Sequence, residues 1–148
     1  MNKNIHTEIT TSHIEPNDLY NFTSHEAHGA ISSFVGVVRN KNLGREVVAV
    51  DYDVHDSMAE KVFYDIASKI IQKYNDSLKI YISHFKGRLE IGGISIAIGV
   101  SSPHRKEAIN ACSLIIEEIK HKAPIWKKEF YIDGESDWVK GHELCSHG

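Results

Sequence analysis

The sequence predicts an α+β domain with a largely antiparallel sheet and two long helices. Three observations lead to this prediction. β-rich runs and two amphipathic helical segments follow one another in the order ββαββαβ, and turn-like residues separate neighbouring strand runs. The 148 residues are enough for one core, and no repeat or linker divides them. We therefore expect a single domain over residues 1–148, with a polar tail from about residue 140.

The first two strands are expected at Gly29–Val38 and Glu46–Val54, which carry the β-rich strings GAISSFVGVV and EVVAVDYDV. A turn-like stretch from Asn40 to Gly44 lies between them, directly after the cation Arg39. The two runs therefore predict a hairpin with a long basic loop.

The first long helix is expected at Asp56–Tyr74, because apolar residues recur there at helical spacing. Either Asp56 or Ser57 is available as its N-cap, since both residue types accept hydrogen bonds from unpaired backbone N–H groups. The pattern predicts an amphipathic helix with one face on the core.

The second long helix is expected to begin at Ser102 and Pro103. Serine is a favoured N-cap, and proline is tolerated at the first helical position. The helix is expected to end near Lys122, because Pro124 disfavours helical geometry at Ala123.

Three further strands are expected at Leu78–His84, Ile94–Ser101 and Ile125–Ile132. The glycine-punctuated string KGRLEIGG separates the first two of them. The continuous apolar run ISIAIGV in Ile94–Ser101 indicates a strand that is covered on both faces.

The composition excludes several function classes. A formal net charge of -3 gives no general attraction to nucleic acid or to an anionic membrane. Two cysteines, Cys112 and Cys145, form no disulfide framework or zinc-type pairing, which favours a reducing compartment. The N-terminal residues lack the apolar core of a signal peptide, and no run approaches the roughly 20 apolar residues that span a bilayer. We expect a cytoplasmic protein.

No metal site is predicted. His142, Cys145 and His147 are ligands by type, but they stand in a glycine-flanked tail, where such residues are more often unstructured than metal-binding. Cys112 falls on an apolar helical stripe and is expected to be a small buried hydrophobic residue.

The start of the second helix carries an unusual group of cations. His104, Arg105 and Lys106 stand where the helix dipole favours acidic residues. One interpretation is an anion site, in which the helix terminus and the cations hold a phosphate or carboxylate. The alternative is that the three side chains reach solvent and that Glu107 offsets their charge.

Helical spacing limits how this helix can act. Arg105 and Lys120 fall at opposite ends of one stripe, about 22 Å apart at 1.5 Å per residue. They cannot easily hold the same small ligand within one chain. Either only one end of the helix is functional, or the site is shared between two copies in a symmetric dimer.

The last predicted strand contains Lys127, which can interact with Lys120 at the end of the second helix. Alternation places Lys127, Glu129 and Tyr131 on one face and Lys128, Phe130 and Ile132 on the other. Lys127 can approach Lys120 across the short HKAP connection. Two ammonium groups held close repel each other, so one could become a neutral amine that acts as base or nucleophile, with Glu129 restraining it. The alternative is a solvated basic strand.

Three strings of the chain, GAISSFVGVVRN, SSPHRKEAINAC and IKHKAPIWKKE, resemble signatures of the MoaE family, the large subunits of molybdopterin synthase. The resemblance spans about Gly29 to Val139. It implies a hammerhead-type fold and a sulfurtransferase without metal or organic cofactor. Such an enzyme converts cyclic pyranopterin monophosphate to the molybdopterin dithiolene. The sulfur donor is a small ubiquitin-like subunit with a C-terminal thiocarboxylate, and two large subunits form the central homodimer of a heterotetramer.

The resemblance also implies roles for individual residues. Catalysis would fall to Lys120, beside the incoming thiocarboxylate, and to Lys127. The anionic pterin would contact Arg39, His104 and Arg105, the backbone of Val37 and Val38, and, nearby, Lys128 and Glu129. The pocket would be lined by Phe34 and Ile116. Phe34 and Arg39 have opposite strand parity, so both reach the site only if the alternation breaks, and Gly36 is a natural bulge position.

The sequence departs from the family pattern at a few positions. His55 stands where an aromatic residue is usual, Ile116 replaces a commoner methionine, and His142 or Lys140 takes the place of a basic residue after the last Trp-Val. Two other function classes stay open. One is a non-catalytic, anion-binding dimeric scaffold for the small subunit, and the other is a phosphoester hydrolase, which lacks an obvious metal site.

Overall fold

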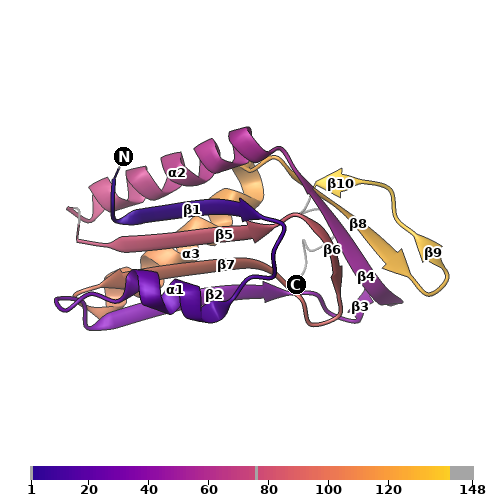
Figure 1. The fold of residues 1–148 in the computed structure, drawn as a ribbon, viewed down its shortest axis with the longest axis horizontal. Helices are drawn as coiled ribbons and strands as arrows, with labels where there is room; N and C mark the ends of the chain where they lie inside the picture. The colour runs from indigo at the N-terminus through magenta and orange to yellow at the C-terminus, as the bar shows by residue number, and fades with distance from the viewer. Residues whose placement is uncertain (1, 76, 141–148) are drawn as a thin grey trace.

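The fold contains two sheets, and the computed structural model describes it over residues 2–75 and 77–140. The first sheet has four strands, with only the β1–β5 pair parallel. In spatial order the strands are β1 (Ile5–Thr10), β5 (Lys79–Phe85), β7 (Ile94–Ser102) and β2 (Ala30–Val37). The long helices α2 (Asp56–Lys73) and α3 (Arg105–Lys122) pack together on one face, and the short α1 (Pro16–Thr23) covers the other (Figure 1).

The second sheet is antiparallel and projects from one end of the first (Figure 1). Its strands are β3 (Lys41–Asn42), β4 (Arg45–Val54), β6 (Gly87–Glu90), β8 (Ile125–Tyr131), β9 (Gly134–Glu135) and β10 (Val139–Lys140). The predicted α+β fold with largely antiparallel strands and two long helices is thus confirmed. The two sheets meet next to the C-terminal end of α3, and this junction positions the candidate site.

The predicted hairpin between Gly29–Val38 and Glu46–Val54 is wrong. β2 pairs with β7, whereas β4 pairs with β8 and β6 in the other sheet. The chain changes sheet at Val38, which exchanges backbone hydrogen bonds with Gly92 and Gly93 instead of with β4. A tight hairpin does form, but between β3 and β4. The positive φ angles of Leu43 (53°) and Gly44 (74°) match the type I′ turn that suits the twist of a two-residue hairpin.

Both long helices lie where they were predicted, but their N-caps differ. The N-cap of α2 is His55, whose Nδ1 accepts a hydrogen bond from the N–H of Met58 at 3.4 Å. β7 continues through Ser102, so α3 begins at Arg105 with His104 as its N-cap. The hydroxyl of Ser102 donates to the carbonyl of His104, which holds the bend between strand and helix. The predicted end at Lys122 is confirmed, with Ala123 as C-cap.

Six elements of the described residues were not predicted: α1 and the strands β1, β3, β6, β9 and β10. The N-terminal strand and helix complete the first sheet and cover it. Leu19 of α1 packs directly on Gly99 of β7, where a Cβ atom would lie 2.5 Å from the leucine side chain. β7 is buried along nearly its whole length, between α1 on one face and α3 on the other. The prediction that this strand is covered on both faces is confirmed.

Candidate active site

A cavity of about 190 Å³ lies between β2, the start of β7, the end of α3 and the second sheet. Its walls are mostly apolar, and it contains five of the residues predicted for the site: Phe34, Val37, Ile116, Lys120 and Lys127. The two lysines reach it from the last turn of α3 and from β8. Lys120 and Lys127 therefore line the same cavity, while their mutual approach stays a prediction.

A smaller hollow of about 70 Å³ adjoins this cavity and shares Val37, Tyr52 and Lys127 with it. Val38, Arg39 and Glu129, three more predicted residues, line the hollow. The site therefore has two parts. The cavity is mostly apolar and is lined by Lys120 and Lys127, and the smaller hollow is polar and is lined by Arg39 and Glu129.

A β-bulge brings β2 into both hollows. The register of β2 on β7 shifts between Gly36 and Val37, where Gly36 pairs with Ile96 and Val37 with Ile94. The break in alternation predicted at Gly36 is confirmed. Gly36 also faces Ile96 so closely that a Cβ atom would lie 2.9 Å from its side chain, which leaves room for no larger residue without a shift.

Lys127 and Glu129 form a buried ion pair. Alternation along β8 buries both residues, each 3% exposed, and their Nζ and Oε1 atoms lie 3.5 Å apart. Burial of two charges is tolerated only when they are paired and hydrogen-bonded. The predicted common face of Lys127 and Glu129 is thus confirmed, and the alternative of a solvated basic strand is wrong for Lys127.

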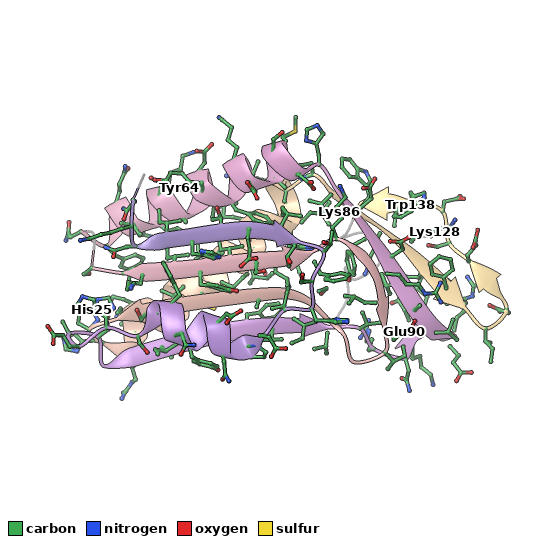
Figure 2. All side chains as sticks on the ribbon, in the orientation of Figure 1. His25, Tyr64, Lys86, Glu90, Lys128 and Trp138 are labelled. Carbon is green, nitrogen blue, oxygen red and sulfur yellow. The ribbon has the colours of Figure 1, made fainter. Side chains whose placement is uncertain are left out.

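Lys128 lies on the opposite face of β8, outside both hollows. Its Nζ is 3.0 Å from Oε1 of Glu135, and it lies over the rings of Phe130 and Trp138. Figure 2 shows the Lys128 and Trp138 side chains beside each other on the outer part of the second sheet. The structure does not bring Lys128 to the other predicted site residues.

His104 and Arg105 lie at the start of α3, 16 and 15 residues before Lys120, and they line neither hollow. Nearby, Nδ1 of His28 is 2.8 Å from the hydroxyl of Ser101, and its ring stacks on His25. Burial, followed by the charges of His25 and Lys79, lowers the pKa of His28. Figure 2 shows His25 at the end of the molecule opposite Lys128. One chain therefore cannot bring both ends of α3 to one small ligand.

Four polar residues that line the site were not predicted: Tyr52, His84, Ser95 and Asn42. His84 is 5% exposed, and its Nδ1–H donates to the carbonyl of Phe85 at 2.8 Å. Burial lowers the pKa of His84 to about 4, so the ring is neutral near pH 7, with Nδ1 protonated because a carbonyl only accepts. Its edge meets the ring of Tyr52 at 5.3 Å between centroids. The sequence feature that could have identified His84 is a histidine within a mostly apolar strand.

The remaining sequence predictions concern metals, membranes and cysteine. Within the described ranges, no group of three or more His, Cys, Asp or Glu side chains could hold a metal ion. No helix in the same part of the chain is long and apolar enough to cross a membrane. Cys112 is buried as predicted, and burial raises the pKa of its thiol. His142, Cys145 and His147 lie outside the described residues.

Comparisons with known proteins identify the family of the chain. Residues 9–122 match the family model described as MoaE protein. The chain is 42% identical over 124 residues to the molybdopterin synthase catalytic subunit of Synechococcus elongatus, covering 84% of this chain and 75% of that relative. It is 40% identical to the molybdopterin synthase catalytic subunit of Dictyostelium discoideum, covering 95% and 90%. The crystal structure of molybdopterin synthase from Staphylococcus aureus matches with a TM-score of 0.85 at 37% identity, covering 94% and 98%. The chain therefore belongs to the MoaE protein family.

Proposed function

We propose that this chain is the catalytic subunit of a molybdopterin synthase. It transfers sulfur from the thiocarboxylated C-terminus of a small ubiquitin-like subunit to cyclic pyranopterin monophosphate, and thereby forms the molybdopterin dithiolene. The observation that carries the proposal is the apolar cavity in which Lys120 and the buried Lys127 converge.

The cavity suits the donor's tail. In the family that the chain resembles, the donor ends in Gly-Gly. Such an end has no bulky side chains, so its backbone fits a narrow cavity with apolar walls such as Phe34 and Ile116. Its thiocarboxylate is an anion, and ammonium groups in a site of low polarity stabilise it strongly. The same groups stabilise the carboxylate that remains on the donor after its sulfur has been transferred and water has supplied the replacing oxygen. Lys120 and Lys127 are therefore the catalytic residues.

The smaller, polar hollow suits the pterin. Arg39 is exposed at the hollow beside Lys127 and offers a guanidinium to the cyclic phosphate, with the backbone of Val37 and Val38 alongside. Glu129 lies at the back of the hollow and restrains Lys127.

His104 and Arg105 complete the site from a second copy of the chain. Both side chains are exposed at the start of α3, where a helix terminus and two cationic groups favour a phosphate. Because they lie too far from Lys120 of the same chain, they serve the cavity of the partner in a symmetric homodimer. Each copy also binds one small subunit, which gives a heterotetramer. Lys128, on the outer face of β8, contributes to substrate only through such an assembly.

The proposal extends to the chain as a whole. Residues 1–148 form one catalytic domain, and its location is cytoplasmic, which fits the reduced, buried thiol of Cys112.

A single-turnover assay tests the function. The purified chain is mixed with thiocarboxylated small subunit and cyclic pyranopterin monophosphate, and dithiolene is quantified over time. The expected result is product that requires both the donor and the pterin. A protein that binds both partners but forms no dithiolene is a scaffold, and that outcome contradicts the proposal. Release of phosphate from the pterin without donor would instead indicate a hydrolase.

A further inference from the structure

A third buried polar side chain, Asn42, stands behind the lysine and carboxylate of the site. It belongs to β3, directly before the tight turn at Leu43 and Gly44, and it is 6% exposed. Neither the motifs nor the charge pattern of the sequence singled it out. A buried amide needs partners for its donors and its acceptor, so its contacts reveal what it does.

The amide of Asn42 binds groups on both sides. Its Nδ2 lies 3.2 Å from Oε1 and 3.1 Å from Oε2 of Glu129, so it donates to the carboxylate. Its Oδ1 accepts from Nη2 of Arg39 at 3.4 Å. The reverse orientation would set the amide oxygen against a carboxylate and the amide nitrogen against a guanidinium, so the two contacts fix the side chain in one orientation. Asn42 thus links Arg39 to Glu129.

Glu129 in turn controls Lys127. The 3.5 Å between Nζ of Lys127 and Oε1 of Glu129 exceeds the 2.7–2.9 Å of a close ammonium–carboxylate hydrogen bond. Oε1 is one of the two oxygens that Asn42 occupies. A carboxylate whose oxygens already accept hydrogen bonds from a neutral donor attracts a neighbouring ammonium group less strongly.

We propose that Asn42 is a positioning residue for sulfur transfer: by binding both oxygens of Glu129, it keeps this carboxylate from drawing Lys127 out of the cavity. The inference rests on the proposed function, because it concerns the residue that assists the transfer. An amide is suited to the task since it supplies donors without adding a charge. A lysine or arginine at this position would neutralise Glu129, and an aspartate would repel it.

A second partner keeps the carboxylate anchored when Asn42 is changed. Burial, and next a hydrogen bond and the charge of Glu129, raise the pKa of Tyr131, while a hydrogen bond to Asn42 and the charge of Arg45 oppose this rise. The hydroxyl therefore stays protonated beside the carboxylate. The backbone of Glu129 is also held by Ser136, whose hydroxyl accepts from its N–H at 2.8 Å. Variants of Asn42 therefore leave Glu129 with a partner and are expected to fold.

The test compares Asn42→Asp and Asn42→Ala with the control Asn40→Asp. The aspartate variant keeps an oxygen for Arg39 but loses the donor to Glu129. The control places the same charge at an exposed position two residues earlier on the same loop. Each variant is assayed by single turnover with thiocarboxylated donor and pterin from pH 5.5 to 8.5, and its thermal unfolding midpoint is measured.

For Asn42→Asp we expect the rate constant at pH 8 to fall about 10- to 100-fold, the loss typical of a displaced catalytic group, while the pterin concentration at half-maximal rate stays within about threefold. Part of the rate returns at low pH, where the protonated aspartate again donates to Glu129. Asn42→Ala loses a similar factor at every pH, and Asn40→Asp behaves like the unaltered chain.

Two results would overturn the inference. One is an unchanged rate constant across the pH range in a folded Asn42→Asp chain. The other, decisive if that variant does not fold, is an unchanged rate constant in Asn42→Ala. The proposed function fails separately: in that case the unaltered chain itself makes no dithiolene.

Discussion

Replacement of Lys120 by alanine is expected to lower the single-turnover rate of dithiolene formation by about 100- to 1000-fold, the loss seen when one preorganised group of an anion-stabilising site is removed. Lys120 ends the apolar stripe of α3 and lines the cavity together with Lys127. Without its ammonium group, the thiocarboxylate and the carboxylate formed from it lose a charge partner in a poorly solvated slot. Alanine preserves the helix, so the loss reflects chemistry rather than folding.

The matched control is Lys122→Ala. This lysine stands two residues later in the same helix turn, pairs with Glu118 and lies outside the cavity. Its replacement is expected to leave the rate within about twofold, because an exposed pair of this kind contributes little. Equal product formation by Lys120→Ala and the unaltered chain would refute the catalytic role of Lys120.

Replacement of Arg105 by alanine is expected to raise the pterin concentration at half-maximal rate by about 10- to 100-fold, as loss of a hydrogen bond to a charged group predicts. The guanidinium is exposed in the first turn of α3 and points to no acidic partner within the described residues. In our account, its partner is the phosphate of the pterin bound at the other copy. The measurement is the initial rate over a series of pterin concentrations at saturating donor.

Lys61→Ala provides the control for loss of a cation. Lys61 is exposed on α2, where its Nζ lies 3.6 Å from the carboxylate of Asp65. We expect an unchanged pterin dependence for this variant. An unchanged pterin dependence for Arg105→Ala as well would remove the start of α3 from the site.

Periodic segments of the sequence predicted most of the regular structure. The end of α3 followed from Pro124, and the two faces of β8 followed from strict alternation, which correctly paired Lys127 with Glu129 on the buried side. The bulge at Gly36 was also foreseen, because Phe34 and Arg39 could not otherwise share a site. In the first two cases the determining interactions lie within a few residues, and in the third the family resemblance supplied the condition that Phe34 and Arg39 share a site.

Long-range pairing explains the errors. The segments Gly29–Val38 and Glu46–Val54 were predicted to pair because they are adjacent in sequence. In the structure each pairs instead with a strand from the C-terminal half of the chain, β2 with β7 and β4 with β8. β1 depends on β5 for its identity as a strand, and its alternation of polar and apolar residues is short. Local pattern carries little information about such pairings.

The missed residues of the site have the same origin. Tyr52 reaches the cavity because β4 pairs it with Lys127 on β8, and His84 because β5 pairs it with Ile96 on β7. Asn42 reaches Glu129 across 87 residues of sequence. Spacing within one helix or strand predicts none of these contacts. It did predict where the cationic residues lie along α3 and β8.

Complementation between two inactive variants tests whether each site combines the lysine cavity of one copy with the start of α3 of the other copy. Lys120→Ala and Arg105→Ala chains carry different affinity tags, and the mixed dimer is purified by both. One of its two sites then contains an intact lysine and an intact arginine. At a pterin concentration far below half-saturation, where each parent homodimer is nearly inactive, we expect the mixed dimer to show about half of the wild-type initial rate. A mixed dimer no more active than the mean of its parents would contradict the account and place the whole site within one chain.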